Sequence, residues 1–563
     1  MSTALDDVLA HLGYAHRPQQ DALFAHLMTI DGGGVIAQAG TGTGKSIAVL
    51  AAAAELAEVH GLPSLVVCPT NILLDQYIET DAPGVEASLG VRVRALKGRN
   101  HYLCASAPGW LVARDPRAAH ALAERLNDRS KVQETLDTYY GCPGSDECDP
   151  DGVCHYRMAK ERLQDADIII TNAHLLIIDA QLKAASEDGP RIFPDLGAIF
   201  VDEAHALEEV ARGFTESSIN LATVDSMGHY GAPLVALMRT WERQVREPRE
   251  IGTHLMPHLA AALRTLKMWK PEESERPSQR KYDVARAAQN ILLAGERGVF
   301  ADGHRVLWFD PPKDKKMSRV VGTDINLSAM MGQILHAQPF AMVSATIPST
   351  LSRALGVPEA RFIDVGHPFD YARQAAIGFS ALPGDYRSSQ SPANMAQRAD
   401  ELAQKVLDIG GGALLLFSSF RDLDFVYARI ALRLRSAGIT VLIQERDSDK
   451  NRLADMFKKD GNAVLFGSAS FATGFDCPGD ALRMVSLWKL PYPGLDPVTR
   501  AISAASRQRY EDMMLVASVQ AIGRLIRTST DYGTVWVADS RGREKLIARS
   551  DPMTAHLREF APL

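Results

Sequence analysis

The sequence is poor in the features that mark several classes of protein. It has only 6 cysteines among 563 residues, too few for the dense disulfide framework of a small secreted domain. It has no uninterrupted apolar run long enough to cross a bilayer, and its acidic N-terminal segment lacks the apolar core of a signal peptide. It also lacks an excess of positive charge, because 61 Lys and Arg against 68 Asp and Glu give a net charge of −7. We therefore expect a cytoplasmic protein without a membrane partner, in which nucleic acid could bind only along a local basic track.

What the sequence does contain is the composition and patterning of a folded α/β protein. Its length predicts several domains, and 46% hydrophobic with 23% charged residues is typical of globular chains. Continuous apolar runs, which are typical of parallel strands covered on both faces, alternate with helical stretches. They fall into two successive sets, which predicts two α/β domains. The expected strands are 35–37, 64–67, 168–170, 198–201, 340–343, 413–417, 440–443, 463–466, 484–487 and 534–537.

Two segments interrupt the first set of strands. Residues 98–165 hold four of the six cysteines, and residues 206–335 look mainly helical. An α/β domain needs neither segment, because its own connections are short, so we interpret both as inserted subdomains. The expected division is a first α/β domain of residues 1–97, 166–205 and 336–370, and a second of residues 371–563.

A glycine-rich loop follows the first expected strand and precedes a helical run. Its residues are Ala39-Gly40-Thr41-Gly42-Thr43-Gly44-Lys45-Ser46. Glycines let the backbone curl so that its N–H groups point at phosphate oxygens, and the helix N-terminus adds partial positive charge. Lys45 would reach the β- and γ-phosphates of a nucleoside triphosphate, and the Ser46 hydroxyl would ligate Mg²⁺. The generic pattern begins with glycine where this chain has Ala39, so one position departs from it.

An acidic motif follows the expected strand 198–201: Asp202-Glu203-Ala204-His205. Acidic residues at the carboxyl end of a buried parallel strand lie where α/β sheets bind their ligands. Asp202 can hold Mg²⁺ through its water ligands, and Glu203 can orient and deprotonate an attacking water. Taken alone, the motif is equally typical of a helix N-terminus with favourable dipole charges. The phosphate loop in the same chain favours the hydrolytic interpretation.

A basic segment near the C-terminus reads as a helix: Gln520-Ala521-Ile522-Gly523-Arg524-Leu525-Ile526-Arg527. Gln520, Arg524 and Arg527 would share one face of that helix, because they lie at positions i, i+4 and i+7. Two arginines on one face suit the negative charge that develops on a transferring γ-phosphoryl group. The alternative is a solvated basic face without a catalytic role.

These motifs, in this order and spacing, resemble the superfamily 2 DNA helicases of the DinG/XPD type over nearly the whole chain. The segments similar to helicase motifs are 17–20 (Q motif), 65–70 (Ia), 202–205 (II), 344–346 (III), 417–420 (IV), 467–479 (V) and 520–527 (VI). Two further segments, 96–104 and 166–176, resemble the entry to and the exit from the family's iron–sulfur domain. The resemblance implies that the two α/β domains are RecA-like motor domains, that 98–165 is an iron–sulfur-type domain and that 206–335 is a helical arch.

The resemblance also implies the roles of individual residues. Gln20 would read the adenine of ATP, and the other ATP contacts would come from Gly40, Thr41, Gly42, Thr43, Gly44, Lys45, Ser46 and Gln520. The residues implied in hydrolysis are Lys45, Asp202, Glu203, Arg524 and Arg527. Those implied in coupling ATP to DNA are His205, Ser344, Thr346, Gly474 and Asp476. The implied activity is ATP-dependent 5′-to-3′ movement on single-stranded DNA, which unwinds duplex, fork or R-loop DNA.

Two departures from the family pattern stand out. Relatives usually carry Trp-Glu-Gly where this chain has Ala472-Thr473-Gly474, and often Ser-Pro-Phe where it has His367-Pro368-Phe369. The first change puts fine coupling between ATP and DNA in doubt. No exonuclease domain is expected before the Q motif. This compact form resembles the DinG-like helicases that accompany type IV CRISPR systems, which implies a CRISPR ribonucleoprotein effector as partner.

Four cysteines fall within the first insert. Cys104, Cys142, Cys148 and Cys154 are separated by 37, 5 and 5 residues, and four thiolates suit a [4Fe–4S] cluster or a Zn²⁺ ion. Zinc sites usually use pairs about two to four residues apart, and the flanking segments resemble the family's cluster domain. We therefore predict a structural [4Fe–4S] cluster, with zinc and unligated cysteines as alternatives. The remaining two cysteines, Cys68 and Cys477, are read as small buried residues.

The family implies that single-stranded DNA crosses both motor domains beneath the two inserts. Such a groove needs cations for phosphates and aromatic rings for base stacking. The candidates are Thr70, Ser419, Phe369, Tyr371, Lys267, Trp269 and Lys281, with further insert residues at Arg264, Lys270, Arg280, Tyr282, Lys313, Lys315, Lys316 and Arg319. For each of these alone, a solvated surface position is an equally good interpretation.

Two other functions stay open at this point. The first is an ATP-gated DNA clamp or recruitment factor, for example a CRISPR effector accessory, which would hydrolyse ATP but separate few strands. The Ala472-Thr473-Gly474 departure is compatible with such a clamp. The second is an RNA-directed motor, because many DEAH-box proteins act on RNA.

Overall fold

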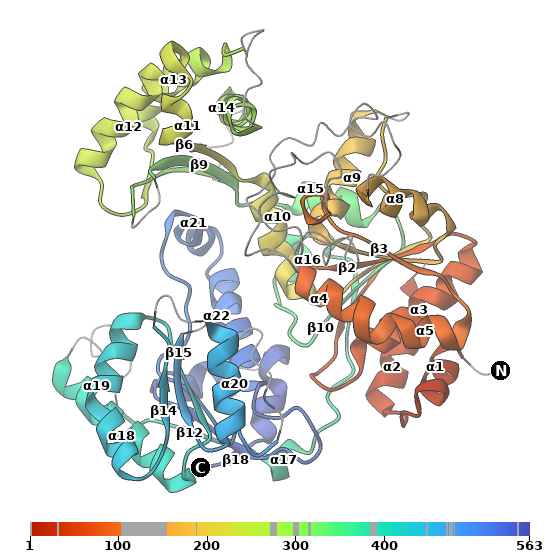
Figure 1. Ribbon diagram of the computed structural model, residues 1–563, viewed down its shortest axis with the longest axis vertical. Coiled ribbons are helices and arrows are strands. Elements are labelled where there is room, and N and C mark those ends of the chain that lie inside the picture. The colour runs from red at the N-terminus through yellow and green to blue at the C-terminus, as the bar shows by residue number, and fades with distance from the viewer. Residues whose placement is uncertain are drawn as a thin grey trace, which may run out of the picture.

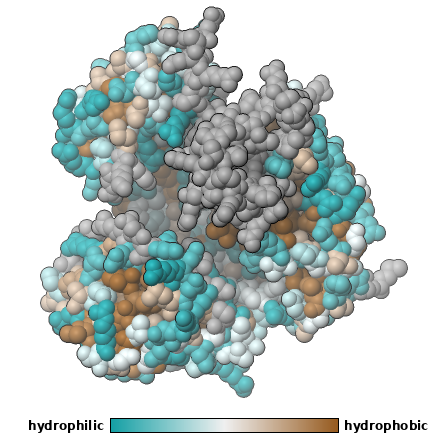
Figure 2. Space-filling view, viewed as in Figure 1, coloured by the Kyte–Doolittle hydropathy of each residue, from teal (hydrophilic) through white to brown (hydrophobic). Residues whose placement is uncertain are grey.

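The computed structural model has three lobes, each built on its own β-sheet (Figure 1). The N-terminal lobe lies at the right of Figure 1, the C-terminal lobe at the lower left and the third lobe at the upper left. Figure 2 shows mostly hydrophilic residues on this face, which is hollowed between the upper-left and lower-left lobes. The residues described are 3–30, 33–102, 155–186, 189–270, 279–296, 303–313, 317–382, 391–445, 449–468, 471, 477, 479–548 and 551–563.

The N-terminal lobe contains a seven-stranded sheet in the order β11-β1-β10-β5-β2-β4-β3, and every neighbouring pair is parallel. The strands are β1 (Val35–Gln38), β2 (Ser64–Cys68), β3 (Val93–Leu96), β4 (Ile168–Asn172), β5 (Ala198–Val201), β10 (Phe340–Ser344) and β11 (Arg361–Asp364). One face packs against α1 (Ala4–Leu12), α2 (Pro18–Leu27), α3 (Lys45–His60) and α5 (Ala82–Leu89). The other packs against α9 (Ala173–Ala185), α10 (Leu207–Thr215), α15 (Ser328–Leu335) and α16 (Leu351–Ala354).

The C-terminal lobe contains a second seven-stranded parallel sheet, in the order β14-β15-β13-β16-β17-β12-β18. Its strands are β12 (Ala375–Phe379), β13 (Ala413–Phe417), β14 (Val441–Ile443), β15 (Val464–Ser468), β16 (Met484–Leu487), β17 (Gly533–Val537) and β18 (Ala561–Pro562). One face packs against α18 (Pro392–Ile409) and α19 (Phe420–Ser436). The other packs against α17 (Tyr371–Gln374), α20 (Lys450–Asp460), α22 (Arg507–Ile522) and η13 (Pro552–Glu559).

The third lobe is built from the chain between α10 and α15. Its sheet is antiparallel, in the order β6-β9-β8-β7, with strands β6 (Ser217–Asn220), β7 (Arg249–Glu250), β8 (Arg305–Asp310) and β9 (Arg319–Asp324). The helices α11 (Leu221–Asp225), α12 (Ala232–Gln244), α13 (Met256–Lys267) and α14 (Gln279–Glu296) accompany it and pack on one face. The prediction that residues 206–335 are mainly helical therefore found the helices but missed this sheet. Short apolar runs such as that of β8 do not distinguish a strand from a buried helix.

The ten strands expected from the sequence are all present, because each is a continuous apolar run in a parallel sheet. The sequence missed four strands of the large sheets: β3, β11, β12 and the two-residue β18. Both β3 and β11 are edge strands of the first sheet that carry an arginine and are partly exposed. Edge strands need only one covered neighbour and tolerate charge, so their pattern is weak.

One expected helix is shorter than predicted. The helix α22 ends at Ile522, so Arg524 and Arg527 lie in the turn that follows and do not share a helical face with Gln520. The reason is local, because the backbone N–H groups of Arg527 and Thr528 donate to Asp531 and not to helical carbonyls. The apolar residues of the segment, Ile522, Leu525 and Ile526, are buried, with 1–2% exposed area. In the described part of the chain, no helix combines the length and apolar character needed to cross a membrane.

Candidate active site

The phosphate loop lies between β1 and α3, where the sequence predicted it. Gly42 and Gly44 have φ values of 75° and 83°, a backbone conformation that favours glycine. Gly44 caps the 16-residue helix α3, so the unpaired N–H groups of its first turn lie at the end of the loop. Lys45 is the first residue of that helix, and its Nζ lies 3.4 Å from the Gly40 carbonyl oxygen. The loop and helix together have the arrangement that binds phosphate.

Two residues from the start of α2 contact this loop from one side. The Gln20 side-chain amide donates to the Gly44 carbonyl at 3.0 Å, and the Arg17 guanidinium donates to the Gly42 carbonyl. Gln20 is buried, and a β-carbon at Gly44 would lie 2.6 Å from its Nε2, so a larger residue there would displace the Gln20 amide. The Q-motif residues therefore contact the phosphate loop directly. The contact between Gln20 and adenine stays a prediction.

The connection between the two large sheets runs across the phosphate loop. The Gly40 N–H donates to the Gly366 carbonyl at 2.9 Å, and the Phe369 ring lies so close to Gly42 that an added β-carbon would be 2.3 Å from its Cζ. The Tyr371 hydroxyl is hydrogen-bonded to Thr41, and burial raises the Tyr371 pKa to about 12. The interdomain connection is thus in direct contact with the loop that would hold ATP.

These contacts cover most of the Tyr371 ring, whereas stacking of Phe369 on bases of DNA stays a prediction. Tyr371 is 4% exposed, and its ring packs against His367, His556 and Phe560 at centroid distances of 4.2, 5.5 and 5.0 Å. The Phe369 ring is half-buried between this cluster and the phosphate loop. A base cannot stack on the buried Tyr371 ring in this arrangement, and both aromatic rings lie beside the phosphate loop.

The acidic motif follows β5 directly. Asp202 is 4% exposed, accepts a hydrogen bond from the Tyr77 hydroxyl at 2.8 Å and accepts another from the Glu203 N–H at 2.8 Å. Burial and the neighbouring Glu203 charge raise the Asp202 pKa. Glu203 has a φ of 45°. Residues with a β-carbon rarely adopt a positive φ, so the Glu203 backbone is strained. Burial opposes its ionisation, but the His205 hydrogen bond and the Lys45 charge outweigh this effect and lower the Glu203 pKa.

A chain of hydrogen bonds leads from Glu203 to the C-terminal lobe. The Ser344 hydroxyl donates to Glu203 Oε2 at 3.1 Å and lies 2.8 Å from His205 Nδ1. Nδ1 must then carry the proton that bonds Ser344, which leaves His205 Nε2 to accept from the Gln520 amide 2.5 Å away. Residues from motifs II, III and VI thus meet across the two parallel sheets. Thr346 follows in the same segment, with its N–H 3.3 Å from the Ser344 hydroxyl.

The residues around Ser46 fit a magnesium ion bound with nucleotide. The Ser46 hydroxyl donates to the Asp81 carboxylate, and Asp81 has a buried Oδ2 that has no hydrogen-bond partner within the described residues. Burial raises the pKa of Asp81. A hydroxyl and two carboxylates, those of Asp81 and Asp202, form an oxygen donor set of the kind that Mg²⁺ prefers alongside phosphate. The sequence did not single out Asp81, which lies in the π-helical turn η2 (Tyr77–Asp81), a type of turn often found at functional sites.

The turn after α22 lies next to the phosphate loop. A β-carbon at Gly523 would be 3.9 Å from the Thr41 methyl group, and the Arg527 charge acts on Tyr371, which in turn contacts Thr41. Asp531 holds this turn, because it accepts from the N–H groups of Arg527 and Gly479 at 2.7 and 2.9 Å. Burial opposes the ionisation of Asp531, but hydrogen bonds from Thr528, Arg527 and Gly479 lower its pKa. Asp531 was missed, because a single aspartate in a polar turn carries no motif signal.

Helix α22 makes two further contacts with the chain around the N-terminal sheet. Asp512 is 1% exposed and accepts from the Thr350 N–H and hydroxyl at 3.0 and 2.8 Å. Arg509 donates to Glu208 of α10 at 2.9 Å and to the carbonyl of Ile325, at the end of β9, at 3.1 Å. One helix of the C-terminal lobe therefore contacts both other lobes.

The remaining predicted DNA residues lie apart from one another. Thr70 is exposed at the end of β2, and Ser419 is exposed at the start of α19, where its hydroxyl caps the helix. Lys267 is the last residue of α13, Trp269 lies two residues after it, and Lys281 lies at the start of α14. The Trp269 ring packs edge-on against Tyr282 at 5.4 Å, which joins these two helices of the third lobe.

Several predicted residues lie outside the part of the chain that the structure describes. They are the four insert cysteines Cys104, Cys142, Cys148 and Cys154, the coupling residues Gly474 and Asp476, and the cations Lys315 and Lys316. The reading of Cys68 and Cys477 as small buried residues is confirmed, with 0% and 3% exposed area.

Two family models match the chain. Residues 17–109 match the DEAD/DEAH box helicase model, and residues 402–557 match the helicase C-terminal domain model. Similar proteins include the ATP-dependent helicase DinG of Mycobacterium tuberculosis, at 26% identity over 94% of this chain and 91% of the relative. They also include the ATP-dependent DNA helicase YoaA of Escherichia coli, at 23% identity over 93% of this chain and 91% of the relative.

Solved structures of XPD helicases share the fold. One XPD helicase covers 98% of this chain and 99% of its own, with a TM-score of 0.60 at 17% identity. Xpd4 of S. tokodaii covers 97% of this chain and all of its own, with a TM-score of 0.59 at 14% identity.

The parallel sheets, the phosphate loop and the acidic motif after β5 define a P-loop motor with two RecA-like domains. These matches support a DinG/XPD-type superfamily 2 helicase and an ATP-driven helicase enzyme. The predicted family and enzyme class are therefore confirmed.

Proposed function

We propose that this helicase acts on DNA, moving along one strand and separating duplex, fork or R-loop DNA. Two observations support a DNA motor: the two-sided nucleotide site and the relative named as a DNA helicase. The observation that carries the motor mechanism is the 2.5 Å contact between Gln520 and His205, which joins motif VI of one RecA-like domain to motif II of the other. Binding or hydrolysis of the nucleotide would thereby change the positions of residues in both domains.

The proposed hydrolytic roles follow from the position of each side chain. Lys45 and the N–H groups of the loop would hold the β- and γ-phosphates. Glu203, ionised and oriented by Ser344 and His205, would accept a hydrogen bond from the attacking water. Mg²⁺, held by Ser46 and Asp202, would neutralise charge on the phosphate oxygens.

The arginines would complete the site from the second domain. Arg524 and Arg527 lie in the turn beside the phosphate loop and would approach the γ-phosphoryl group as the domains close on ATP. Hydrolysis would release this contact and let the domains separate again. Closing and opening would alternate the grip on the DNA strand, which is the basis of stepwise movement.

The domain roles remain our proposal. Residues 1–97, 166–205 and 336–370 would form the first motor domain and residues 371–563 the second, with 98–165 as the cluster domain and 206–335 as the arch. The strand would cross both motor domains beneath these inserts, and the family resemblance favours 5′-to-3′ movement. Cys104, Cys142, Cys148 and Cys154 would ligate the [4Fe–4S] cluster.

Strand displacement measured beside ATP hydrolysis tests the function. We expect single-stranded DNA to stimulate ATP hydrolysis, and ATP to drive release of a labelled strand from a duplex with a 5′ tail but not from one with a 3′ tail. The matched control is Lys45→Ala, which removes the phosphate contact and should abolish both activities without unfolding the protein. Normal ATP turnover by this variant would refute the assigned nucleotide site.

The same assays separate the alternatives. Brisk DNA-stimulated hydrolysis without strand release would favour the ATP-gated clamp, and stronger stimulation by RNA than by DNA would favour an RNA motor. The association with a type IV CRISPR effector is a separate prediction, which the genes next to this one would decide: a CRISPR array and effector subunits would support it.

A further inference from the structure

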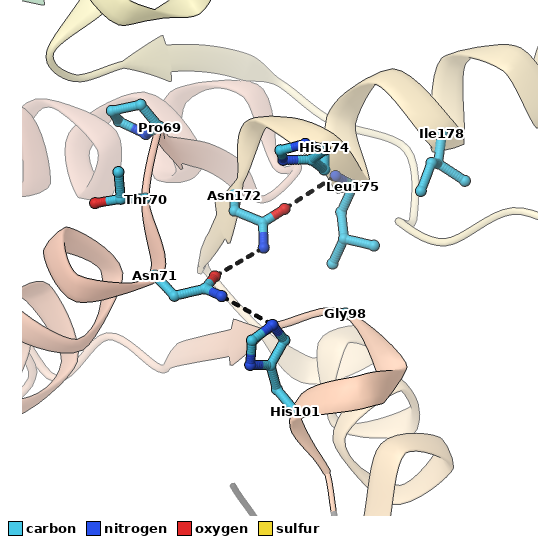
Figure 3. A pocket seen from close by; sticks show the side chains of 9 residues that line it. All are labelled: Pro69, Thr70, Asn71, Gly98, His101, Asn172, His174, Leu175 and Ile178. Atoms are coloured by element: carbon cyan, nitrogen blue, oxygen red, sulfur yellow. Dashed lines mark hydrogen bonds between the residues drawn. The ribbon is translucent and has the colours of Figure 1, made fainter. Parts of the chain in front are cut away.

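A cavity lies on the same edge of the N-terminal sheet as the nucleotide site. The phosphate loop follows β1 and the acidic motif follows β5, whereas β2, β4 and β3 come next in the sheet order. The segments that follow these three strands surround a cavity of about 420 Å³ (Figure 3). Its lining residues are Pro69, Thr70, Asn71, Gly98, His101, Asn172, His174, Leu175 and Ile178. Ligands of parallel α/β sheets bind at this edge, and the nucleotide loop occupies only part of it.

A hydrogen-bond network fixes the three segments around the cavity. The Asn71 side-chain amide lies 2.9 Å from His101 Nε2, and its oxygen accepts from the Asn172 amide at 2.9 Å. The Asn172 oxygen in turn accepts from the Leu175 N–H at 3.1 Å, which caps α9 (Figure 3). Asn172 is 7% exposed, so the network is largely shielded from water and its geometry is preorganised.

The chemistry of the lining selects a neutral, flat, hydrogen-bonding ligand. Among the described residues that line the cavity, none is Asp, Glu, Lys or Arg, so these residues supply neither a carboxylate for a metal ion nor a permanent cation for phosphate. Each of the two asparagine amides carries two N–H groups, and only one of the two is used within the described residues. Pro69, Leu175 and Ile178 supply apolar wall area beside these donors. The size falls within the range of about 300–1,000 Å³ typical of ligand pockets.

We propose that this cavity receives an unpaired base of the bound single strand. A base has a flat apolar face for the Leu175 side and an edge of donors and acceptors for Asn71 and Asn172. Its edge is available only when the strand is unpaired, which matches a motor on single-stranded DNA; the inference therefore rests on the proposed function. Thr70, a predicted DNA residue, lies on the rim and would meet the backbone of the same nucleotide.

The position of the base pocket also connects it to ATP hydrolysis. The Asp202 N–H donates to the carbonyl of Val67 at 3.0 Å, and Val67 lies in β2, immediately before the Pro69–Asn71 segment. The backbone of the acidic motif is thus bonded to the strand that carries one wall of the pocket. Binding or release of a base in the pocket would therefore shift the backbone of Asp202 through the single strand β2.

The test compares binding of two strands that differ only in their bases. Dissociation constants are measured by fluorescence anisotropy, without ATP, for an oligothymidylate and for an abasic strand of the same length. His174→Ala and Asn71→Ala should each weaken binding of the oligothymidylate about 3- to 10-fold, the effect of losing one or two neutral contacts. Neither should weaken binding of the abasic strand more than about 2-fold. The matched control is Gln181→Ala, an exposed position further along α9 outside the pocket, which should leave both constants unchanged.

Each other outcome has a definite meaning. Equal losses on both strands, or no loss on either, would overturn the base pocket. If the unmodified protein bound neither strand and showed no DNA-stimulated hydrolysis, the proposed function would fail instead. His174 is exposed and accepts no hydrogen bond from the network, so its variant keeps the test valid if Asn71→Ala does not fold. The same binding measurement with an oligouridylate shows whether the pocket also accepts RNA.

Discussion

Among single residues, Arg527 has a backbone position that is set by one buried carboxylate. Asp531 accepts from the Arg527 N–H at 2.7 Å and from the Thr528 N–H at 2.8 Å, which turns the chain away from the α22 axis. The arginine side chain starts from this fixed turn beside the phosphate loop. Under the proposed function, placement of the guanidinium relative to ATP would depend on closing of the two domains, because the backbone of the turn is held by Asp531.

Arg527→Ala should lower the catalytic rate of ATP hydrolysis far more than it weakens ATP binding. The guanidinium would stabilise charge that develops only in the transition state, and such arginines contribute roughly 10³–10⁵ in rate where measured. Steady-state kinetics gives kcat and KM separately. Arg507→Ala is the matched control, because this exposed arginine lies at the far end of α22 and pairs with Glu511. An unchanged kcat in Arg527→Ala would reject the catalytic role.

Asp81 is a second residue whose role the structure makes testable. Its carboxylate accepts the Ser46 hydroxyl hydrogen, which would leave the Ser46 oxygen lone pairs available to a magnesium ion. Asp81→Ala should raise the Mg²⁺ concentration for half-maximal hydrolysis about 10- to 100-fold, and Asp81→Asn should recover part of the loss. Magnesium titrations at saturating ATP measure this. Glu79→Ala, in the same turn but exposed, is the control, and a common magnesium dependence for all these variants would contradict the assignment.

At the scale of elements, α22 connects the lobes. Along its length it presents Arg509 to Glu208, Asp512 to Thr350 and Gln520 to His205. It then leads directly into the turn that carries the two arginines. A shift of α22 along its axis would therefore change the nucleotide site and both interlobe contacts together, since all lie on one rigid helix.

Asp512→Ala should uncouple strand separation from hydrolysis. The change removes the acceptor for the Thr350 N–H and hydroxyl and for Gln508, which donates to Asp512 at 2.6 Å, while the residues at the phosphate loop stay in place. The expected result is a several-fold fall in strands released per ATP hydrolysed. Glu511→Ala is the matched control, because the ion pairs of Glu511 with Arg507 and Lys545 lie within the C-terminal lobe. Equal efficiency of the two variants would show that this contact does not transmit motion.

At the scale of the whole molecule, the third lobe touches the C-terminal lobe through a small apolar contact, in addition to hydrogen bonds from Arg509 to the Ile325 carbonyl and from Arg500 to the Pro248 carbonyl. Ile502 of α21 (Pro497–Ala505) is fully buried against Trp308 and Val321 of the β8–β9 hairpin. The opposite face of that hairpin packs against the lobe's own helices. A contact of this size holds the lobe in place without fusing it to the motor domain, so the two can separate during a cycle.

The prediction for the whole molecule concerns the metal bound by the first insert, residues 98–165. Protein purified without oxygen should contain about four iron and four sulfide per chain, because four thiolates at this spacing suit a [4Fe–4S] cluster. Iron and sulfide assays with an absorption spectrum measure this, and Cys142→Ser should lower both contents. Cys68→Ser is the control, because that cysteine is buried at the end of β2 and is not one of the four predicted ligands. Stoichiometric zinc, or the absence of metal, would dismiss the cluster.

Much of the N-terminal nucleotide site could be predicted from the sequence, because its signals are local. A continuous apolar run followed at once by Gly-Lys-Ser or by Asp202-Glu203 fixes both the strand and what lies at its carboxyl end. The same local logic located the expected strands of both large sheets. It failed at the end of α22, where the partner that stops the helix, Asp531, lies beyond the predicted segment.

The sequence by itself determined the strand–loop–helix that holds phosphate, the acidic motif and the division into two parallel sheets. Only the tertiary structure decided the partners of these groups: His205 with Gln520, Glu208 with Arg509 and Ser46 with Asp81. The first two pairs are separated by 315 and 301 residues. Hydrogen-bonded turns and apolar runs are set by neighbours in the chain, whereas these pairs form only when packed sheets and helices bring distant segments together.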